Sequence, residues 1–281
     1  MDLFLNILKS VLYGIVQGIT EWLPISSTGH LILMRTFMPL NVYMDAVSNQ
    51  NFWDMYKVVI QFGSILAVLL LYFKKLNPFN PRLKSARKRS IYRLWIMIII
   101  ACVPAGIAGI LLDDLIDNVL SESYVIAITL ILYCILFIVM ESREHQYTVE
   151  TVKDITPKTA FGVGMFQMLA LIPGTSRSGA TILGATLLGF NRSTATEFSF
   201  FMAIPVMFGA SLLKIIKAHI EVTVASISVL LVGCIVSFVV SVFAIRYLMQ
   251  YIRKHDFKVF GVYRIILGVI VLLFYMLNVI Q

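Results

Sequence analysis

Three side chains that could do chemistry stand close together in a stretch that is otherwise strongly apolar. Residues 21–30 read EWLPISSTGH and include the carboxylate of Glu21, the hydroxyl of Ser27 and the imidazole of His30. Ser27 and His30 are three positions apart, so on a helix they share a face, and a serine near an imidazole is a nucleophile-and-base arrangement. His30 could instead protonate a leaving phosphate or act as the nucleophile itself.

A second polar stretch, IPGTSRSGA at 172–180, contributes the guanidinium of Arg177, whose planar fork suits phosphate. Helices that start after PISSTG and PGTSRSG would aim free N–H groups and positive dipole ends at one pocket. This pattern predicts an anion site of the phosphate kind. We expect the substrate to be bound by small and hydroxyl residues of both stretches: Ser26, Ser27, Thr28, Gly174, Thr175, Ser176 and Ser178.

Two simpler interpretations compete with a phosphate site. Glu21 and Arg177 could form an internal ion pair that only holds the two stretches together, and the hydroxyls could only cap the helices that follow. Function is favoured, because ionisable groups are costly within a membrane and because capping needs one or two hydroxyls, whereas six are present. Glu21 could also hold a divalent cation, Mg²⁺ or Ca²⁺, together with the phosphates of a substrate.

The composition indicates which elements position these residues. Hydrophobic residues make up 59% of the 281 residues and charged residues only 14%, which is typical of an integral membrane protein. We therefore expect an all-α polytopic membrane protein with a single domain covering 1–281. Six segments are predicted to cross the bilayer: 58–73, 94–112, 123–140, 198–216, 225–245 and 260–279. The first is short and could extend back through residues 53–56. The apolar stretches 3–39 and 159–190 are interrupted by Pro, Gly and hydroxyl residues.

Charge predicts the orientation of the spans. Residues 74–93 contain eight Lys and Arg and no acidic residue, and between two spans such a run is typical of a cytoplasmic loop. No nucleic-acid-binding fold accompanies it, so we expect no nucleic-acid partner. With 246–258 also cytoplasmic, the stretch 159–190 must start and finish on the cytoplasmic side, as a re-entrant hairpin. By the same logic 3–39 enters from outside, although it could instead cross once.

An internal repeat supports the two hairpins. At an offset of 150 residues, GIVQGITEWLPISSTGHLIL (14–33) aligns with GMFQMLALIPGTSRSGATIL (164–183). Each half, about 1–140 and about 155–281, then has one broken hairpin followed by three spans. An odd number of spans places the halves in opposite orientations, which is the inverted-repeat plan with a site near the midplane. Two further residue groups receive simple interpretations: the aromatic residues of 52–56 as an interfacial belt and Arg264 as a side chain that extends toward the membrane surface. A phosphate role for Arg264 is the less favoured alternative.

The chain resembles bacterial undecaprenyl-diphosphate phosphatases, the bacitracin-resistance protein family. The similarity lies in GIVQGITEWLPISSTGHL and IPGTSRSGAT, with EFSFFMAIPVM (197–207) and QFGSILAV (61–68) in the expected order, and it covers essentially the whole chain. The resemblance implies a membrane enzyme that removes one phosphate from the C55 isoprenyl diphosphate carrier lipid, needs a divalent cation and confers bacitracin resistance. It also implies an inverted-repeat fold in the bacterial cytoplasmic membrane, with a site that opens outward. Whether the protein forms a homodimer is left open.

The resemblance also assigns residues. Glu21, Ser27, His30 and Arg177 match the essential acid, serine, histidine and arginine of the motifs, and Gln17 stands where many members carry a second Glu, so metal binding would depend more on Glu21. Whether Ser27 or His30 attacks phosphorus is left open. The main alternative function is a transporter or flippase of polyprenyl phosphates, and a structural membrane subunit is a third. The Ser27/His30 pair favours the enzyme, because moving a lipid needs no nucleophile.

Overall fold

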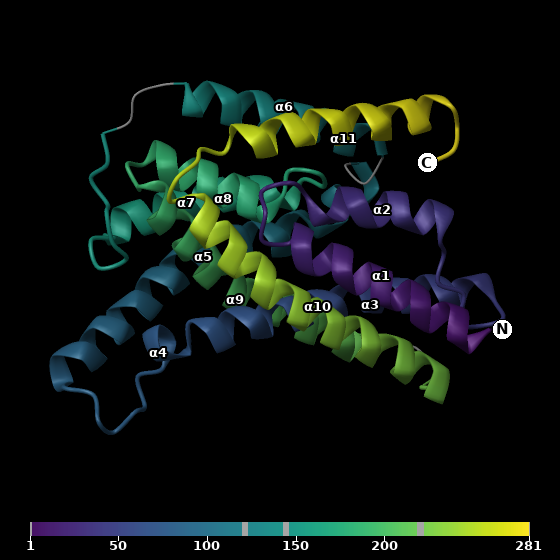
Figure 1. Ribbon diagram of the computed structural model, residues 1–281, viewed down its shortest axis with the longest axis horizontal. Helices are drawn as coiled ribbons and strands as arrows, with labels where there is room; N and C mark the ends of the chain where they lie inside the picture. Colours follow the sequence, from purple (N-terminus) through teal and green to yellow (C-terminus); the bar gives the residue numbers. More distant parts are fainter. Residues whose placement is uncertain (1, 120–122, 143–145, 218–221, 281) are drawn as a thin grey trace.

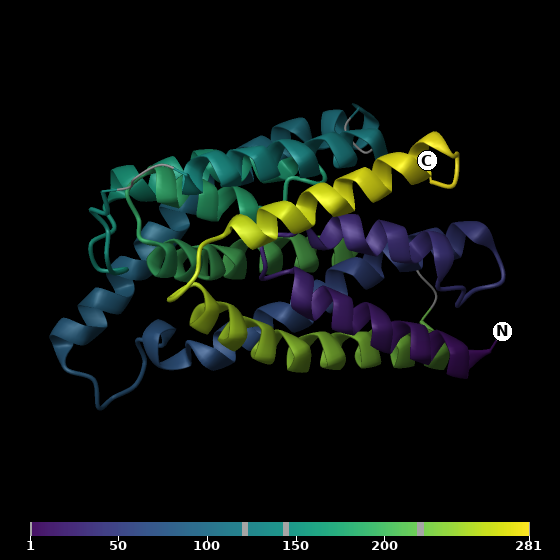
Figure 2. The ribbon, with the colours of Figure 1, turned by 45° about the horizontal axis from the view of Figure 1, so that its top comes forward.

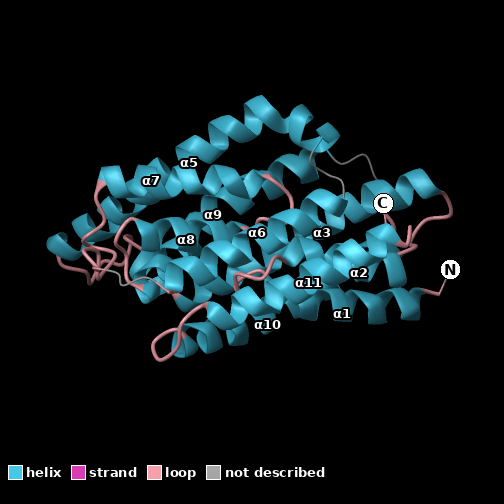
Figure 3. Ribbon diagram, turned by 90° about the horizontal axis from the view of Figure 1, so that it is seen from above, coloured by secondary structure: helices cyan, strands magenta, loops and turns pink. Residues whose placement is uncertain are grey.

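The computed structural model describes residues 2–119, 123–142, 146–217 and 222–280. These residues form an all-α fold, with no named β-strand among them. Long helices run in roughly one direction, and most connecting loops lie at the two ends of the molecule (Figure 3). In chain order the elements are α1 (Leu3–Thr20), α2 (Ser27–Phe37), α3 (Ala46–Leu71), α4 (Phe73–Leu76), α5 (Ser85–Val119), α6 (Ser123–Glu141), α7 (Pro157–Met168), η1 (Leu169–Leu171), α8 (Arg177–Leu187), α9 (Arg192–Lys217), α10 (Val224–Tyr251) and α11 (Lys258–Met276).

Seven of the described helices are long and apolar enough to cross a membrane: α1, α3, α5, α6, α9, α10 and α11. Six of them overlap the predicted spans, so the expectation of an all-α polytopic membrane protein is confirmed. The seventh, α1, is the first arm of the broken stretch 3–39. Its 18 residues meet the length criterion for a span. A turn ends α1 at Thr20, and α2 then runs back beside it (Figures 1 and 2).

The first predicted span was placed too late in the sequence. Helix α3 begins at Ala46 and not at 58, because Asp45 caps its N-terminus by accepting a hydrogen bond from Ser48 N at 2.7 Å. The expectation of an interfacial belt at 52–56 is also wrong. Phe52 and Trp53 are 0% and 3% exposed, since the helical period turns them toward α1 and into the core.

Helix packing relates the two halves in a symmetric way. Helix α1 of the first half packs against α10 of the second, and α7 of the second half packs against α5 of the first. Helices α6 and α11, the last long helix of each half, pack against each other. Glycines allow the closest approaches: a Cβ at Gly14 would lie 2.8 Å from the carbonyl oxygen of Gly233 on α10, and a Cβ at Gly164 would collide with the backbone of Ala101 on α5. Small residues at such crossings are typical of membrane helix packing.

The two polar stretches are turns between neighbouring helices. The turn at 21–26 joins α1 to α2 near the middle of the long axis of the molecule (Figure 1). The second turn, at 172–176, joins η1 to α8. Side chains at the start of α8 and on α11 connect the two turns through hydrogen bonds, described below. Both termini lie at one end of the molecule, and the basic loop 77–84 lies at the opposite end, as does the 252–257 connection (Figure 1).

Candidate active site

A serine caps the helix that follows each turn, and the two serines share an unusual backbone conformation. Ser26 has φ 68° and ψ 96°, and Ser176 has φ 69° and ψ 122°. Each Oγ accepts a hydrogen bond from the glycine N–H three residues later, from Gly29 at 3.4 Å and from Gly179 at 3.2 Å. Non-glycine residues rarely adopt positive φ, and such positions cluster at functional sites. Two of the six hydroxyls therefore do serve as caps, as the simpler interpretation proposed.

Glu21 is the centre of the hydrogen-bond network at the first turn. Its Oε2 accepts hydrogen bonds from Gln17 Nε2 at 3.0 Å and from Ser27 Oγ at 2.9 Å. Its Oε1 lies 3.4 Å from Nη2 of Arg177, which belongs to the other half of the chain. The Glu21 side chain is only 4% exposed. A buried carboxylate needs partners of this kind, because its charge is otherwise costly.

Arg177 connects the second turn to the same cluster. Its Nη1 donates to the carbonyl oxygen of Ser199 on α9 at 2.9 Å, and its guanidinium carbon lies 5.8 Å from the centre of the Trp22 ring. The Arg177 Nε atom is buried and has no hydrogen-bond partner within the described structure. The Glu21–Arg177 ion pair that the simpler interpretation proposed is therefore present. The Nε–H group of Arg177 is a further donor that this ion pair does not use.

The imidazole of His30 forms hydrogen bonds with residues other than Ser27, the partner that the sequence suggested. Its Nδ1 lies 2.7 Å from the carbonyl oxygen of Ser26, and its Nε2 lies 2.6 Å from the hydroxyl of Tyr263 on α11. A carbonyl can only accept, so we infer that Nδ1 carries the hydrogen and that Nε2 accepts from Tyr263. Ser27 donates to Glu21, so the base that contacts this hydroxyl is a carboxylate and not the predicted imidazole.

The remaining predicted residues either connect the turns or border open space. The hydroxyl of Ser178 lies 3.3 Å and 3.2 Å from the carbonyl oxygens of Glu21 and Leu23, so it links the second turn to the first. Thr175 is buried, and Gly174 has φ 89°, a conformation that favours glycine. Thr28 is exposed and lines a cavity.

The structure adds Arg264 on α11, which sequence reasoning assigned to the membrane surface. That expectation is wrong, because the side chain is 0% exposed. Its Nη1 donates to Pro24 O at 3.3 Å, and its Nη2 donates to the carbonyl oxygens of Gly174 at 3.1 Å and Thr175 at 2.9 Å. The guanidinium therefore holds both turns together. An arginine inside an apolar span was the available signal, since such residues face the protein interior and are functional by default.

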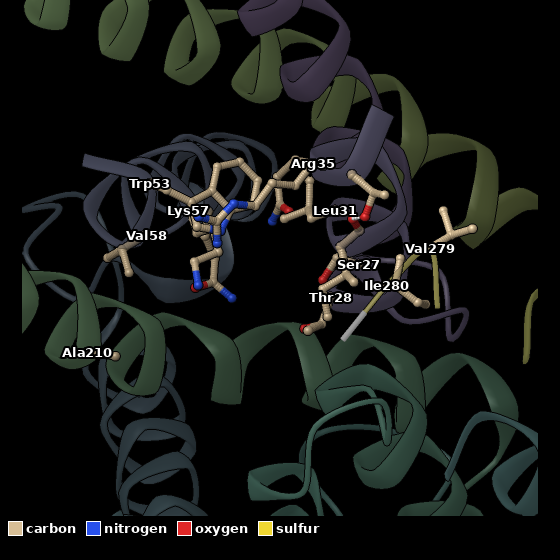
Figure 4. A pocket seen from close by; sticks show the side chains of 14 residues that line it. Ser27, Thr28, Leu31, Arg35, Trp53, Lys57, Val58, Ala210, Val279 and Ile280 are labelled. Carbon is tan, nitrogen blue, oxygen red and sulfur yellow. Dashed lines mark hydrogen bonds between the residues drawn. The ribbon is translucent and has the colours of Figure 1, made fainter. Parts of the chain in front are cut away.

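A cavity of about 710 Å³ reaches this cluster from α2 and α3 (Figure 4). Gln17, Ser27 and Thr28 line it at the cluster. Other lining residues, none of which the sequence analysis proposed as a site residue, are Leu31, Ile32, Arg35, Thr36, Trp53, Lys57, Val58, Gln61, Ala210, Val279 and Ile280. The cavity gives a ligand access to the hydroxyl that donates to Glu21.

The donors around Glu21 fit a hard divalent cation only in part. Carboxylate, hydroxyl and amide oxygens are the ligands that Mg²⁺ and Ca²⁺ prefer, and Glu21, Ser27 and Gln17 offer one of each. The described residues contain no cluster of three or more His, Cys, Asp or Glu that could hold a metal. The protein donors therefore suit a cation that also binds phosphate oxygens and water.

Comparisons with known proteins agree with the geometry. A sequence model of the family described as "Bacitracin resistance protein BacA" matches residues 10–270. "Undecaprenyl-diphosphatase 1" of Clostridioides difficile (strain 630) is 52% identical over 273 residues, which cover 97% of both chains. "Undecaprenyl-diphosphatase" of Enterococcus faecalis is 52% identical over 274 residues, covering 96% of this chain and 97% of the relative. The protein of that name from Acetivibrio thermocellus is 48% identical over 274 residues, covering 97% and 98%.

Proposed function

The chain belongs to the BacA family of bacitracin resistance proteins, and we propose that it hydrolyses undecaprenyl diphosphate to the monophosphate and inorganic phosphate. It is a multi-pass membrane protein, and a location in the bilayer suits a substrate with a long isoprenyl tail. The reaction recycles the lipid carrier of cell-wall synthesis, and bacitracin resistance follows from it. The relatives at about 50% identity over nearly their full length support this activity.

One observation connects this activity to particular residues: the hydroxyl of Ser27 donates to the buried carboxylate of Glu21 beside the guanidinium of Arg177. A serine next to a proton acceptor is an activated nucleophile. A guanidinium stabilises the charge of a transferring phosphoryl group. A flippase would need an anion site but no such hydroxyl–carboxylate pair, so the transport alternative is not favoured.

We propose that Ser27 attacks the terminal phosphorus. The bond from Ser27 Oγ to phosphorus forms while the bond from phosphorus to the bridging oxygen breaks, and the bridging oxygen leaves with its electron pair on polyprenyl monophosphate. The proton of the serine passes to Glu21, the nearest acceptor at 2.9 Å. Arg177, whose Nη2 lies 3.4 Å from Glu21 Oε1, donates to the phosphoryl oxygens.

Water completes the cycle by attacking the phosphoserine: its oxygen bonds to phosphorus while the bond from phosphorus to Ser27 Oγ breaks. Glu21 returns its proton to Oγ, which restores Ser27, and inorganic phosphate is released. His30 lies one helical turn from Ser27 on α2, so we propose that it accepts the proton of the attacking water in this step. Its Nε2 is an acceptor in the described state, where Tyr263 occupies it at 2.6 Å. Exchange of that hydroxyl for water would bring His30 into the reaction.

We further propose a divalent cation, Mg²⁺ or Ca²⁺, at Glu21, Ser27 and Gln17. When bound, it supplies positive charge to the phosphate oxygens and lowers the cost of crowding anions beside the carboxylate. Arg177 and the N–H groups at the start of α2 and α8 complete the charge balance. The substrate-binding residues of the prediction, Ser26 and Ser176 included, act mainly by shaping these two helix starts.

The membrane orientation is also part of the proposal. The basic loops 77–84 and 252–257 lie at one end of the molecule, so we place that end in the cytoplasm of a bacterium and the termini outside (Figure 1). The turns at 21–26 and 172–176 are then re-entrant and meet inside the bilayer, where protein contacts satisfy their backbone groups. The cavity that contains Arg35 opens outward.

Phosphate release from a long-chain isoprenyl diphosphate tests the function. Purified full-length protein in detergent is assayed with Mg²⁺, with Ca²⁺ and with chelator, beside Arg177→Ala and His30→Ala. We expect cation-dependent release that both substitutions reduce by 100-fold or more, roughly the size seen for lost transition-state donors and acid–base groups. Folded wild-type protein that binds the lipid without releasing phosphate would instead support transport.

A further inference from the structure

We propose that Arg35 and Lys57 form a second phosphate-binding subsite, at the opposite end of the cavity from Ser27. Both side chains line the cavity that reaches the candidate active site. Figure 4 shows them on the same side of this space as Trp53, with Ser27 and Thr28 across it. The inference rests on the proposed function for the identity of the ligand, but the charges and contacts stand independently of it.

Helical spacing places the two ends of the cavity well apart. Ser27, Leu31 and Arg35 follow each other at intervals of four on α2 and all line the cavity. Eight residues of α-helix rise by about 12 Å, which is longer than a diphosphate group. The backbone positions of Ser27 and Arg35 therefore lie at different ends of the cavity wall that α2 forms. The opposite wall has the same spacing, with Trp53, Lys57 and Gln61 on α3.

A network of side chains holds the two cations in place. Arg35 donates to the amide oxygen of Gln50, and Gln50 Nε2 donates to Asp54 Oδ2 at 3.0 Å. Asp54 Oδ1 lies 2.9 Å from Lys57 Nζ. Arg35 and Lys57 also both lie over the ring of Trp53, at 5.1 Å and 5.7 Å from its centre. Cation–π contacts of this kind stabilise each charge at the wall of the cavity.

The balance of charge favours an anion. Asp54 offsets one of the two positive charges, so the network of Arg35, Asp54 and Lys57 keeps one net positive charge. The Lys57 and Asp54 side chains are 37% and 40% exposed, and ion pairs at such exposure are weak. An incoming anion can therefore compete for Lys57. Arg35 has a neutral partner in Gln50, and a guanidinium has five donors.

The ligand of this subsite is a phosphate group, which two sources could supply. One source is inorganic phosphate on its way out from Ser27, and the other is the diphosphate headgroup on its way in. Both carry the charge and the acceptor oxygens that an arginine and a lysine recognise. The subsite would hold the anion two turns of α2 away from the reacting atoms, so it would act on binding and release.

Heat denaturation with phosphate tests the subsite without requiring turnover. Full-length protein in detergent is unfolded with and without millimolar inorganic phosphate at constant ionic strength. The variant Arg35→Gln/Lys57→Gln is compared with Arg35→Lys/Lys57→Arg, which keeps both charges. We expect the phosphate concentration that gives half of the wild-type rise in Tm to increase about tenfold in the glutamine variant only, since charge-assisted hydrogen bonds are lost.

Steady-state kinetics then separates the sources. A higher Ki for inorganic phosphate in the glutamine variant would identify the free product as the ligand, and a higher KM for the lipid diphosphate would identify the headgroup. If the rise in Tm with phosphate, the Ki for phosphate and the KM for the lipid diphosphate in the glutamine variant all match those of wild type, the subsite does not exist. Absence of hydrolysis by the wild type would overturn the proposed function alone, because the Tm measurement still reports phosphate binding.

Discussion

Glu21 and Arg177, 156 residues apart in the chain, face each other in the interior with 3.4 Å between Oε1 and Nη2. Glu21 lies in the first turn and Arg177 is the first residue of the helix after the second turn, and a positive-φ serine caps the helix that follows each turn, Ser26 in one and Ser176 in the other. The contact is long for an ion pair, and both partners have other hydrogen bonds: Glu21 to Ser27 and Arg177 to the Ser199 carbonyl. This loose pairing leaves room for a phosphate group to share the guanidinium.

Replacing Arg177 with lysine should therefore remove most of the activity while keeping a positive charge. An ammonium group cannot donate to Ser199 and to a phosphoryl oxygen in the fork geometry of a guanidinium. We expect kcat to fall by about 100-fold to 1000-fold, as for other lost transition-state donors. Initial rates of phosphate release measure the change, and a Tm close to that of wild type would show that folding is preserved. Activity within a fewfold of wild type would contradict the role of the fork.

The substitution Glu21→Gln tests the proton acceptor. An amide of nearly the same shape keeps a hydrogen bond to Ser27 but cannot take its proton. We expect kcat to fall by about 100-fold to 10,000-fold, the range for general-base removal. Because Glu21 is also the only carboxylate in the proposed cation site, the concentration of Mg²⁺ that gives half-maximal activity should rise as well. An unchanged requirement for Mg²⁺ would place the cation elsewhere.

Arg264 should act as a positioning residue, since it touches the backbone of both turns and no reacting atom. In Arg264→Gln the carbonyl oxygens of Pro24, Gly174 and Thr175 lose their donors. Each buried group left unsatisfied costs about 1–3 kcal/mol, so Tm should fall and kcat should fall with it. Lysine can still donate to one or two of these carbonyls, so Arg264→Lys should recover part of kcat.

The split between KM and kcat distinguishes positioning from a general loss of folded protein. Misplaced turns should lower kcat per folded molecule and change KM for the lipid diphosphate. A reduced folded fraction would lower the total rate and leave both constants per folded molecule unchanged. The latter result would show that Arg264 has a structural role only.

Glycine packing gives a prediction about stability alone. A Cβ at Gly164 on α7 would collide with the backbone of Ala101 on α5, whereas a Cβ at Gly106, also on α5, has no atom within 4 Å. Overpacking typically costs about 1–3 kcal/mol, so Gly164→Ala should lower Tm and Gly106→Ala should not. Heat denaturation in detergent compares the two. Equal Tm values would contradict the close contact between α5 and α7.

Sequence patterns predicted six of the seven candidate spans and the residues that meet at the candidate site, because both depend on local order along the chain. The repeat at an offset of 150 placed Ser26 opposite Ser176 in the alignment, and the structure gives them matching dihedral angles and caps. Ionisable residues in apolar stretches identified Glu21 and Arg177, which meet as expected. The correspondence of the halves as inverted repeats in a membrane stays a prediction.

Contacts that depend on the direction of a side chain could not be obtained in this way. An arginine in an apolar span indicates a position that faces the protein interior, but the sequence around Arg264 does not show that its partners are the carbonyl oxygens of the two turns. The orientation of His30 toward Tyr263 depends on how α2 and α11 pack. The stacking of Arg35 over Trp53 likewise requires α2 and α3 to lie beside the same cavity.

The most direct test of the account is to follow the terminal phosphate during a single turnover. Undecaprenyl diphosphate labelled in its terminal phosphate is mixed with excess protein and Mg²⁺, quenched in acid within milliseconds to seconds and digested for peptide analysis. The account predicts transient label on Ser27, released as phosphate, and no label or turnover in Ser27→Ala. Rapid phosphate release by Ser27→Ala, at a rate near that of wild type, would contradict attack by Ser27.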